Sequence, residues 1–175
     1  MGKCIRTRAA AFRAVAAAMV LQGCGGAAYL EPGRITTGAI AKAERDKQPV
    51  LVGFLKTTAP DSKGAVGVKA QLYNSSGKPY RYVDLLVVGY NTGGRVVAPF
   101  AGDKELVRLR FKGPLKSRQR SDATRWAQVW YDKAVACVEI RRIDITYADG
   151  RRKRLGRRDA PRALPEIGRK SCQQA

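Results

Sequence analysis

Residues 81–90, RYVDLLVVGY, are the most strongly β-patterned stretch of this chain. They are rich in the β-branched and aromatic residues that favour strands, and they run into the turn residues Asn91-Thr92-Gly93-Gly94. A second long stretch, AVACVEIRRIDITY at 134–147, alternates apolar and polar side chains and is followed by the tight-turn pair Asp149-Gly150. The two stretches predict a β-fold.

Shorter segments of the same kind occupy most of the remaining chain between residues 49 and 155. They are PVLVGFLKT (49–57), VGVKAQLY (66–73), RVVA (95–98), ELVRLRF (105–111), TRWAQVWYD (124–132) and RRKRL (151–155). Seven or eight short strands separated by turn residues predict an all-β fold, an antiparallel sandwich. One β-sandwich domain over 35–156 is the simplest division, with residues 35–48 able to form a short helix and a basic, irregular tail at 157–175.

The N-terminus has the layout of a secretory signal peptide. Lys3, Arg6, Arg8 and Arg13 precede the apolar segment 14–21, and small residues follow it. Eight apolar residues are too few to cross a bilayer, which needs about 20. The alternative is an amphipathic or core helix at the start of a cytosolic domain. We therefore predict a signal peptide at 1–23 and a flexible tether at 24–34.

Leu21-Gln22-Gly23-Cys24 resembles the lipobox of bacterial lipoproteins. The resemblance implies cleavage before Cys24 and acylation of its thiol and of the new amino group. Two or three acyl chains anchor a protein far more firmly than one. The residue after the cysteine is Gly25 rather than Asp, and this resembles the sorting pattern for the outer membrane. The expected location is therefore the cell envelope, at the outer membrane and facing the periplasm.

The four cysteines fit an exported chain. Cys4 would be lost with the signal and Cys24 would carry lipid, which leaves Cys137 and Cys172. Two spare cysteines in an exported protein predict a disulfide, and the alternative is a pair of buried free thiols.

The stretch AQLYNSSGKPYRYVDLLVVGYNTGGRVV, residues 70–97, carries a second resemblance. A hydrophobic strand, an Asn-containing turn and a long strand ending in Tyr-Asn look like the FxLYD-type immunoglobulin-like domains of bacterial envelope lipoproteins. Ala70 stands where that motif has Phe, and Asn74 where it has Asp. The resemblance implies a sandwich fold and brings no catalytic residue.

The chain has no histidine among its 175 residues. This excludes Ser-His-Asp and Cys-His nucleophiles and imidazole metal sites. We predict no metal site and no cofactor. Ser75 and Lys78 have a Ser-x-x-Lys spacing, but Gly77 and Pro79 make that segment a turn, and the companion motifs of penicillin-recognising enzymes are missing.

Two groups of aromatic residues are open to two interpretations. Trp126 and Trp130 could stack on sugars or bases, or could fill the core of the sandwich. Tyr80, Tyr82 and Tyr90 share one face of their strand with Asp84. That face could be a surface for a small molecule or glycan, or a half-buried structural face.

The basic residues give the last candidate site. Lys and Arg number 34 against 14 Asp and Glu, a net charge of +20. The densest cluster contains Arg151, Arg152, Lys153, Arg154, Arg157 and Arg158. Such a cluster can bind an anionic surface, or can be a solvated surface without a partner. No nucleic-acid-binding motif is present, so the expected anions are those of the envelope: phospholipid, lipopolysaccharide or peptidoglycan.

These observations favour binding over catalysis. The first hypothesis is a non-enzymatic, lipid-anchored envelope protein whose basic surface meets an anionic partner, which could also be an envelope protein. The second is an accessory subunit of an envelope secretion or pilus machine that binds through an exposed strand edge. The third is an envelope hydrolase that works without histidine.

Overall fold

The computed structural model describes residues 35–100, 105–165 and 172. Its elements, in chain order, are α1 (Thr37–Arg45), β1 (Val50–Thr57), β2 (Val66–Asn74), β3 (Tyr80–Tyr90), β4 (Val96–Val97), β5 (Val107–Leu115), β6 (Thr124–Trp130), β7 (Cys137–Tyr147), β8 (Arg152–Leu155) and the 3-10 helix η1 (Ala160–Ala163). The predicted signal peptide, Cys24 and the tether lie outside the described residues. Within the described part, neither helix has the length and apolar character required to cross a bilayer.

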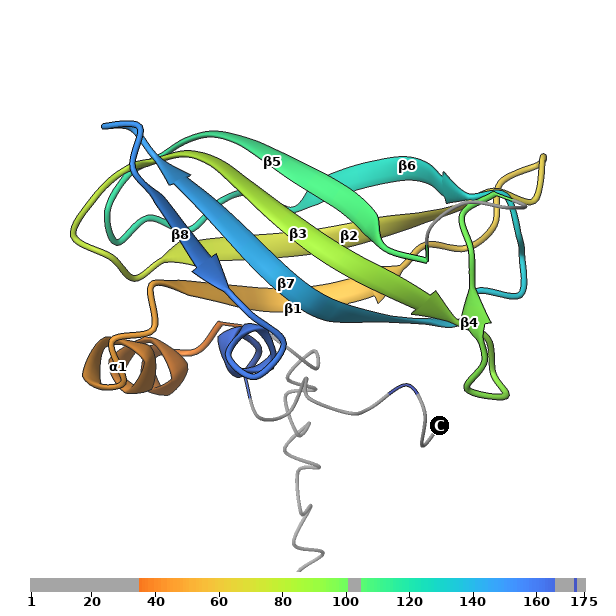
Figure 1. Cartoon of the computed structure of the whole chain (residues 1–175), viewed down its shortest axis with the longest axis horizontal. Helices are drawn as coiled ribbons and strands as arrows, with labels where there is room; N and C mark the ends of the chain where they lie inside the picture. Colours follow the sequence, from red (N-terminus) through yellow and green to blue (C-terminus); the bar gives the residue numbers. More distant parts are fainter. Residues whose placement is uncertain (1–34, 101–104, 166–171, 173–175) are drawn as a thin grey trace, which may run out of the picture.

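The strands form two antiparallel sheets packed as a sandwich (Figure 1). One sheet has the order β1-β2-β6. In the other, β3 pairs with β7 along one edge and with β4 and β5 along the other, and β8 pairs with β7. The chain thus passes from the first sheet to the second, returns for β6 and ends in the second. This is the Greek-key connection of an immunoglobulin-like sandwich, and it confirms the predicted fold class.

The core lies between the sheets and follows from the alternation of the strands. Val83, Leu85 and Val87 of β3 face inward with Ile143 and Ile145 of β7, and all five are fully buried. Because successive side chains of a strand point to opposite faces, the intervening residues point outward. The same two strands that stand out in the sequence therefore form the centre of the second sheet.

Trp130 confirms the core interpretation for one of the two tryptophans. It is fully buried, and its indole N–H donates to the Val97 carbonyl at 3.1 Å. Gly89 packs against the ring, and a methyl group added there would come within 2.8 Å of it. Trp126 lies at the margin of the core and is half-buried.

The predicted domain boundary at residue 156 is wrong. Ala160 and Ala163 of η1 are fully buried and belong to the main core. The predicted tail therefore contributes a folded segment, because small side chains at 160 and 163 let it pack against the sandwich. Beyond η1, Cys172 forms the predicted disulfide with Cys137, with their Cα atoms 5.7 Å apart.

Candidate anion-binding face

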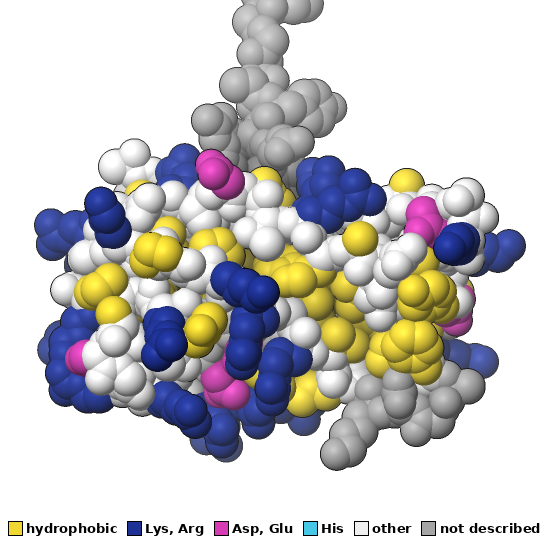
Figure 2. Space-filling view, turned by 90° about the horizontal axis from the view of Figure 1, so that it is seen from above, with side chains coloured by type: hydrophobic (Ala, Val, Ile, Leu, Met, Phe, Trp, Pro, Cys, Tyr) yellow, Lys and Arg dark blue, Asp and Glu magenta, His cyan; other side chains and the backbone are white. Residues whose placement is uncertain are grey.

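The outward face of the second sheet carries a row of cations on each of its outer strands. Tyr82, Asp84 and Leu86 of β3 point outward, and the residues of β5 and β7 that lie opposite them point to the same face of the sheet. The pairing of β7 with β8 extends this outward face to β8, the edge strand. We call the six cations on it the outer basic face: Arg108, Arg110, Lys112, Arg142, Arg152 and Arg154. Figure 2 looks onto the β5 and β6 side of the molecule, and Lys and Arg side chains gather in its lower half.

Two carboxylates lie inside this face and are covered by arginines. Asp84 is 9 % exposed and receives two hydrogen bonds from the guanidinium of Arg110, at 2.7 and 2.8 Å. Asp144 lies directly opposite Asp84 on β7 and pairs with Arg154 at 3.0 Å and Arg142 at 3.2 Å. Asp84 thus has a bidentate arginine partner and Asp144 has two arginine partners, and charge-assisted contacts of this kind are stronger than hydrogen bonds between neutral groups. Six cations against two carboxylates leave an excess of four positive charges.

The three tyrosines of β3 do not form the surface that one interpretation predicted. Tyr80 is fully buried and its hydroxyl donates to the Pro49 carbonyl, and burial raises the pKa of this phenol. Tyr90 is 1 % exposed and its hydroxyl receives a hydrogen bond from Arg141. Tyr82 alone remains half-exposed, with the Arg110 guanidinium 5.1 Å from its ring centre. The interpretation as a structural face is the correct one for Tyr80 and Tyr90.

The residues of the 151–158 cluster fall into two groups. Arg151 and Arg154 pair with Asp149 and Asp144, each at 3.0 Å. The other four are exposed and have no ion pair within the part of the chain that the structure describes: Arg152, Lys153, Arg157 and Arg158. We call these four the β8 cations. Their positive charge is not offset locally, so it is available to a ligand.

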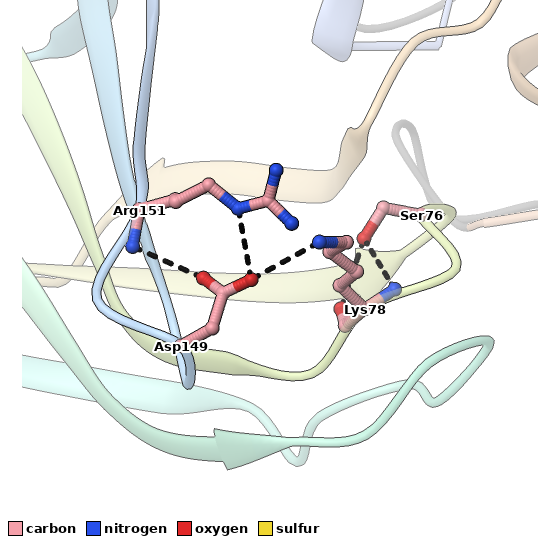
Figure 3. Close-up of polar contacts among 4 residues, drawn as sticks. All are labelled: Ser76, Lys78, Asp149 and Arg151. Carbon is pink, nitrogen blue, oxygen red and sulfur yellow. Dashed lines mark hydrogen bonds and ion pairs between the residues drawn. The ribbon is translucent and has the colours of Figure 1, made fainter.

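Two hairpin turns meet beside β8 and fix the start of that strand (Figure 3). Asp149 Oδ2 lies 3.0 Å from both Lys78 Nζ and Arg151 Nε, and Asp149 Oδ1 accepts the Arg151 backbone N–H at 3.0 Å. The hydrogen bond from Lys78, followed by those from Arg151, lowers the pKa of Asp149 to about 2. The carboxylate therefore stays ionised and pairs with both Lys78 and Arg151.

The Ser-x-x-Lys segment is the turn between β2 and β3, as its glycine and proline predict. Ser75 Oγ donates to the Gln48 carbonyl, and Ser76 Oγ donates to Asn74 Oδ1 at 2.7 Å. Both hydroxyls are therefore engaged in holding the turn. Among the residues that the structure describes, there is also no group of three acidic or cysteine side chains that could hold a metal ion.

Sequence reasoning located the 151–158 cluster, which supplies Arg152 and Arg154 of the outer basic face, and missed its other four cations: Arg108, Arg110, Lys112 and Arg142. Arg108 and Arg110 alternate with Val107 and Leu109 in the sequence, a pattern that predicts an outward row on β5. The pattern does not reveal that β5 and β8 flank the same two central strands. That neighbourhood depends on long-range pairing of β3 with both β5 and β7.

No protein-family model, curated protein or solved structure matches this chain.

Proposed function

We propose that this chain is a non-enzymatic, lipid-anchored protein of a bacterial envelope, held at the outer membrane, that binds a phosphate-bearing anionic surface through its basic residues. The lipobox-like sequence at 21–24 and the pairing of Cys137 with Cys172 support export. Lipopolysaccharide and anionic phospholipid are the phosphate-bearing surfaces of that compartment.

The observation that carries the binding part of the proposal is the state of the β8 cations. Four exposed cations within seven residues form no ion pair in the described part of the chain, because Asp144, Asp149 and Asp159 pair with other basic residues. An arginine that is already paired must exchange its partner to bind a ligand, whereas a free guanidinium gains a bidentate phosphate contact. Each cation near an anionic lipid surface contributes about 1 kcal/mol.

The anchor predicts covalent labelling at one residue. The full chain, produced in a bacterium supplied with labelled palmitate, is expected to take up the label. Cys24→Ala is expected to lose it, because the acylated thiol is removed, and globomycin is expected to block processing of the parent chain. Equal labelling of the parent chain and Cys24→Ala would contradict the anchor.

The binding prediction concerns three of the β8 cations. Changing Arg152, Arg157 and Arg158 to Gln is expected to weaken binding to immobilised lipopolysaccharide roughly 100-fold, because about 1 kcal/mol is lost per cation. The full chain is measured in non-ionic detergent by surface plasmon resonance. The matched control changes three exposed cations elsewhere, Arg45, Lys47 and Lys63, to Gln. If both triple variants bind equally well, the charge of the β8 cations is not what binds the surface.

A second candidate function is favoured by the open edge of β5. An accessory subunit of an envelope secretion or pilus machine could bind a partner strand at such an edge. Lipid phosphate would bind at the β8 cations, whereas a partner strand would bind at the edge of β5. The two functions use different sides of the sandwich, so variants can separate them.

A further inference from the structure

The two lateral sides of the sandwich differ. On the side of β1 and β7, η1 packs against both strands and closes the core with Ala160 and Ala163. On the opposite side, β5 pairs with β3 and β6 pairs with β2, and neither strand has a second strand partner in the described part of the chain. The main polar link across this side is the Trp126 indole N–H, which donates to the Arg110 carbonyl at 3.0 Å. The β5 side of the sandwich is therefore open.

An apolar groove of about 600 Å³ follows this opening. Its apolar lining comes from β5, β6 and the segments before β5: Phe100, Leu106, Val107, Leu109, Trp126 and Val129. Phe100 is 53 % exposed and Leu106 is 40 % exposed. Figure 2 looks onto this side and shows hydrophobic side chains in the hollow between the two layers. Large apolar side chains exposed together mark a binding surface.

The backbone of β5 also presents hydrogen-bonding groups to the opening. One of these, the Arg110 carbonyl, accepts a hydrogen bond from the indole of Trp126, which belongs to β6 in the other sheet. This carbonyl therefore points away from β3. Backbone groups alternate in direction along a strand, so those of Arg108 and Lys112 point the same way. Asp84 and Arg110 lie opposite each other on β3 and β5, and their side chains are in close contact. Side chains approach most closely where the two opposed residues exchange no backbone hydrogen bonds, so the contact indicates such a position. The backbone N–H groups of Arg108, Arg110 and Lys112 thus face the edge of β5 where no strand pairs with it in the described part of the chain, and they can pair with an added strand.

We propose that the edge of β5 binds an extended segment of a partner protein in which acidic residues alternate with apolar residues. A strand added to β5 continues both faces of the sheet. Its outward side chains would lie beside Arg108, Arg110 and Lys112, and its inward side chains would enter the apolar groove. Cross-strand neighbours of opposite charge stabilise a sheet and like charges destabilise it. Arg110 already neutralises Asp84, so the selection of an acidic partner falls to Arg108 and Lys112, which form no ion pair within the described residues. This inference rests on the second candidate function, binding of a partner strand at β5, and adds the chemical character of that strand; the binding of a phosphate-bearing surface through the β8 cations does not depend on it.

The charges on β5 disfavour a second copy of this chain as the occupant, and a separate feature protects the edge of β8. A second copy of this chain paired edge to edge would place cations of β5 opposite one another. The edge of β8 is protected against strand addition, because Lys153 lies opposite the buried Ile145 and so extends from the inward face of the sheet. The open edge with both an apolar groove and a cationic row is therefore that of β5.

The probe is a labelled peptide of alternating Val and Glu, measured by fluorescence anisotropy with the full chain in non-ionic detergent. A matched peptide of alternating Val and Lys is the control. The Val-Glu peptide is expected to bind at least ten-fold more tightly, and added salt is expected to weaken it. Equal binding of the two peptides would overturn the proposal.

Arg108→Pro tests the backbone contact. Its N–H faces the free edge, where proline is tolerated, so pairing with β3 is retained while strand addition is blocked. Arg108→Gln is the matched variant that loses the charge and keeps the N–H. Binding of the Val-Glu peptide is expected to fall at least ten-fold in Arg108→Pro and a few-fold in Arg108→Gln. Unchanged binding by a folded Arg108→Pro would refute strand addition.

Hydrogen exchange on the unmodified chain tests the location without any variant. The Val-Glu peptide is expected to protect the amides of Arg108, Arg110 and Lys112 and to leave those of β8 unchanged. Protection at β8 and not at β5, or protection of β5 that grows with protein concentration in the absence of peptide, would overturn the assignment in favour of another edge or a second copy. Lipopolysaccharide binding by the Arg152, Arg157 and Arg158 variant is unaffected by any of these outcomes.

Discussion

Asn74→Asp is expected to lower the free energy of unfolding by roughly 3–5 kcal/mol, although the two side chains have almost the same shape. Asn74 is fully buried at the end of β2. Its amide Nδ2 donates to the carbonyls of Lys78 and Leu115, at 2.8 and 3.1 Å. A carboxylate cannot donate, so these two carbonyls would lose their partner and face a buried negative charge.

The acceptor side of Asn74 explains why the effect is specific to the amide. Its Oδ1 accepts the backbone N–H and the hydroxyl of Ser76, at 2.9 and 2.7 Å. An aspartate retains those two contacts. Burial favours the protonated carboxyl and raises its pKa above the unfolded value, so the variant is least destabilised below about pH 4 and loses stability as the pH rises toward neutrality.

Urea unfolding at pH 7 measures the effect, and Asn91→Asp is the matched control. Asn91 also closes a hairpin, but it accepts hydrogen bonds through Oδ1 from the N–H groups of Gly93 and Arg95, at 3.0 and 2.9 Å. Aspartate preserves both contacts, so the control is expected to stay within about 0.5 kcal/mol of the parent chain. Similar losses for the two variants would show that the donor contacts of Asn74 contribute little.

Much of the fold could be predicted because the two central strands have strong local patterns. Residues 81–90 and 134–147 alternate or run continuously apolar as buried strands do. Residues 81–90 lie in β3, which pairs with residues 137–147 in β7, while 134–136 precede the strand. The role of Asn74 could not be predicted, because a turn-forming residue gives no sign that its amide will reach the end of a strand 41 residues away.

The candidate site was predicted to the same partial extent. The six cations of the 151–158 cluster are visible as a run in the sequence. Which of these cations are paired depends on Asp144 and Asp149. The register of β7 with β8 places Asp144 opposite Arg154, and the contact between two turns places Asp149 beside Lys78. The burial of Tyr80 and Tyr90 likewise depends on what covers an outward face, and for Tyr90 that cover includes Cys172.

Removing the disulfide with Cys137→Ser and Cys172→Ser together is expected to lower the free energy of unfolding by about 4 kcal/mol. The two cysteines are 35 residues apart, and a crosslink over a loop of that length restricts the unfolded chain by about that amount. The bond also holds Cys172 against Val88 and Tyr90, which form a small apolar cluster with it. Loss of the bond releases this cluster as well, so the folded state is affected in addition to the unfolded one.

Urea unfolding with and without dithiothreitol measures the contribution. The parent chain in reductant is expected to match the double serine variant, and the variant is expected to be insensitive to reductant. Coincident unfolding of the oxidised and reduced parent chains would contradict the estimate. The same thiols also connect stability to location, because such bonds persist in oxidising compartments and are rare in the cytosol. Alkylation in intact cells should therefore leave Cys137 and Cys172 unmodified, and modification of both would remove the support that the disulfide gives to export while leaving the fold unchanged.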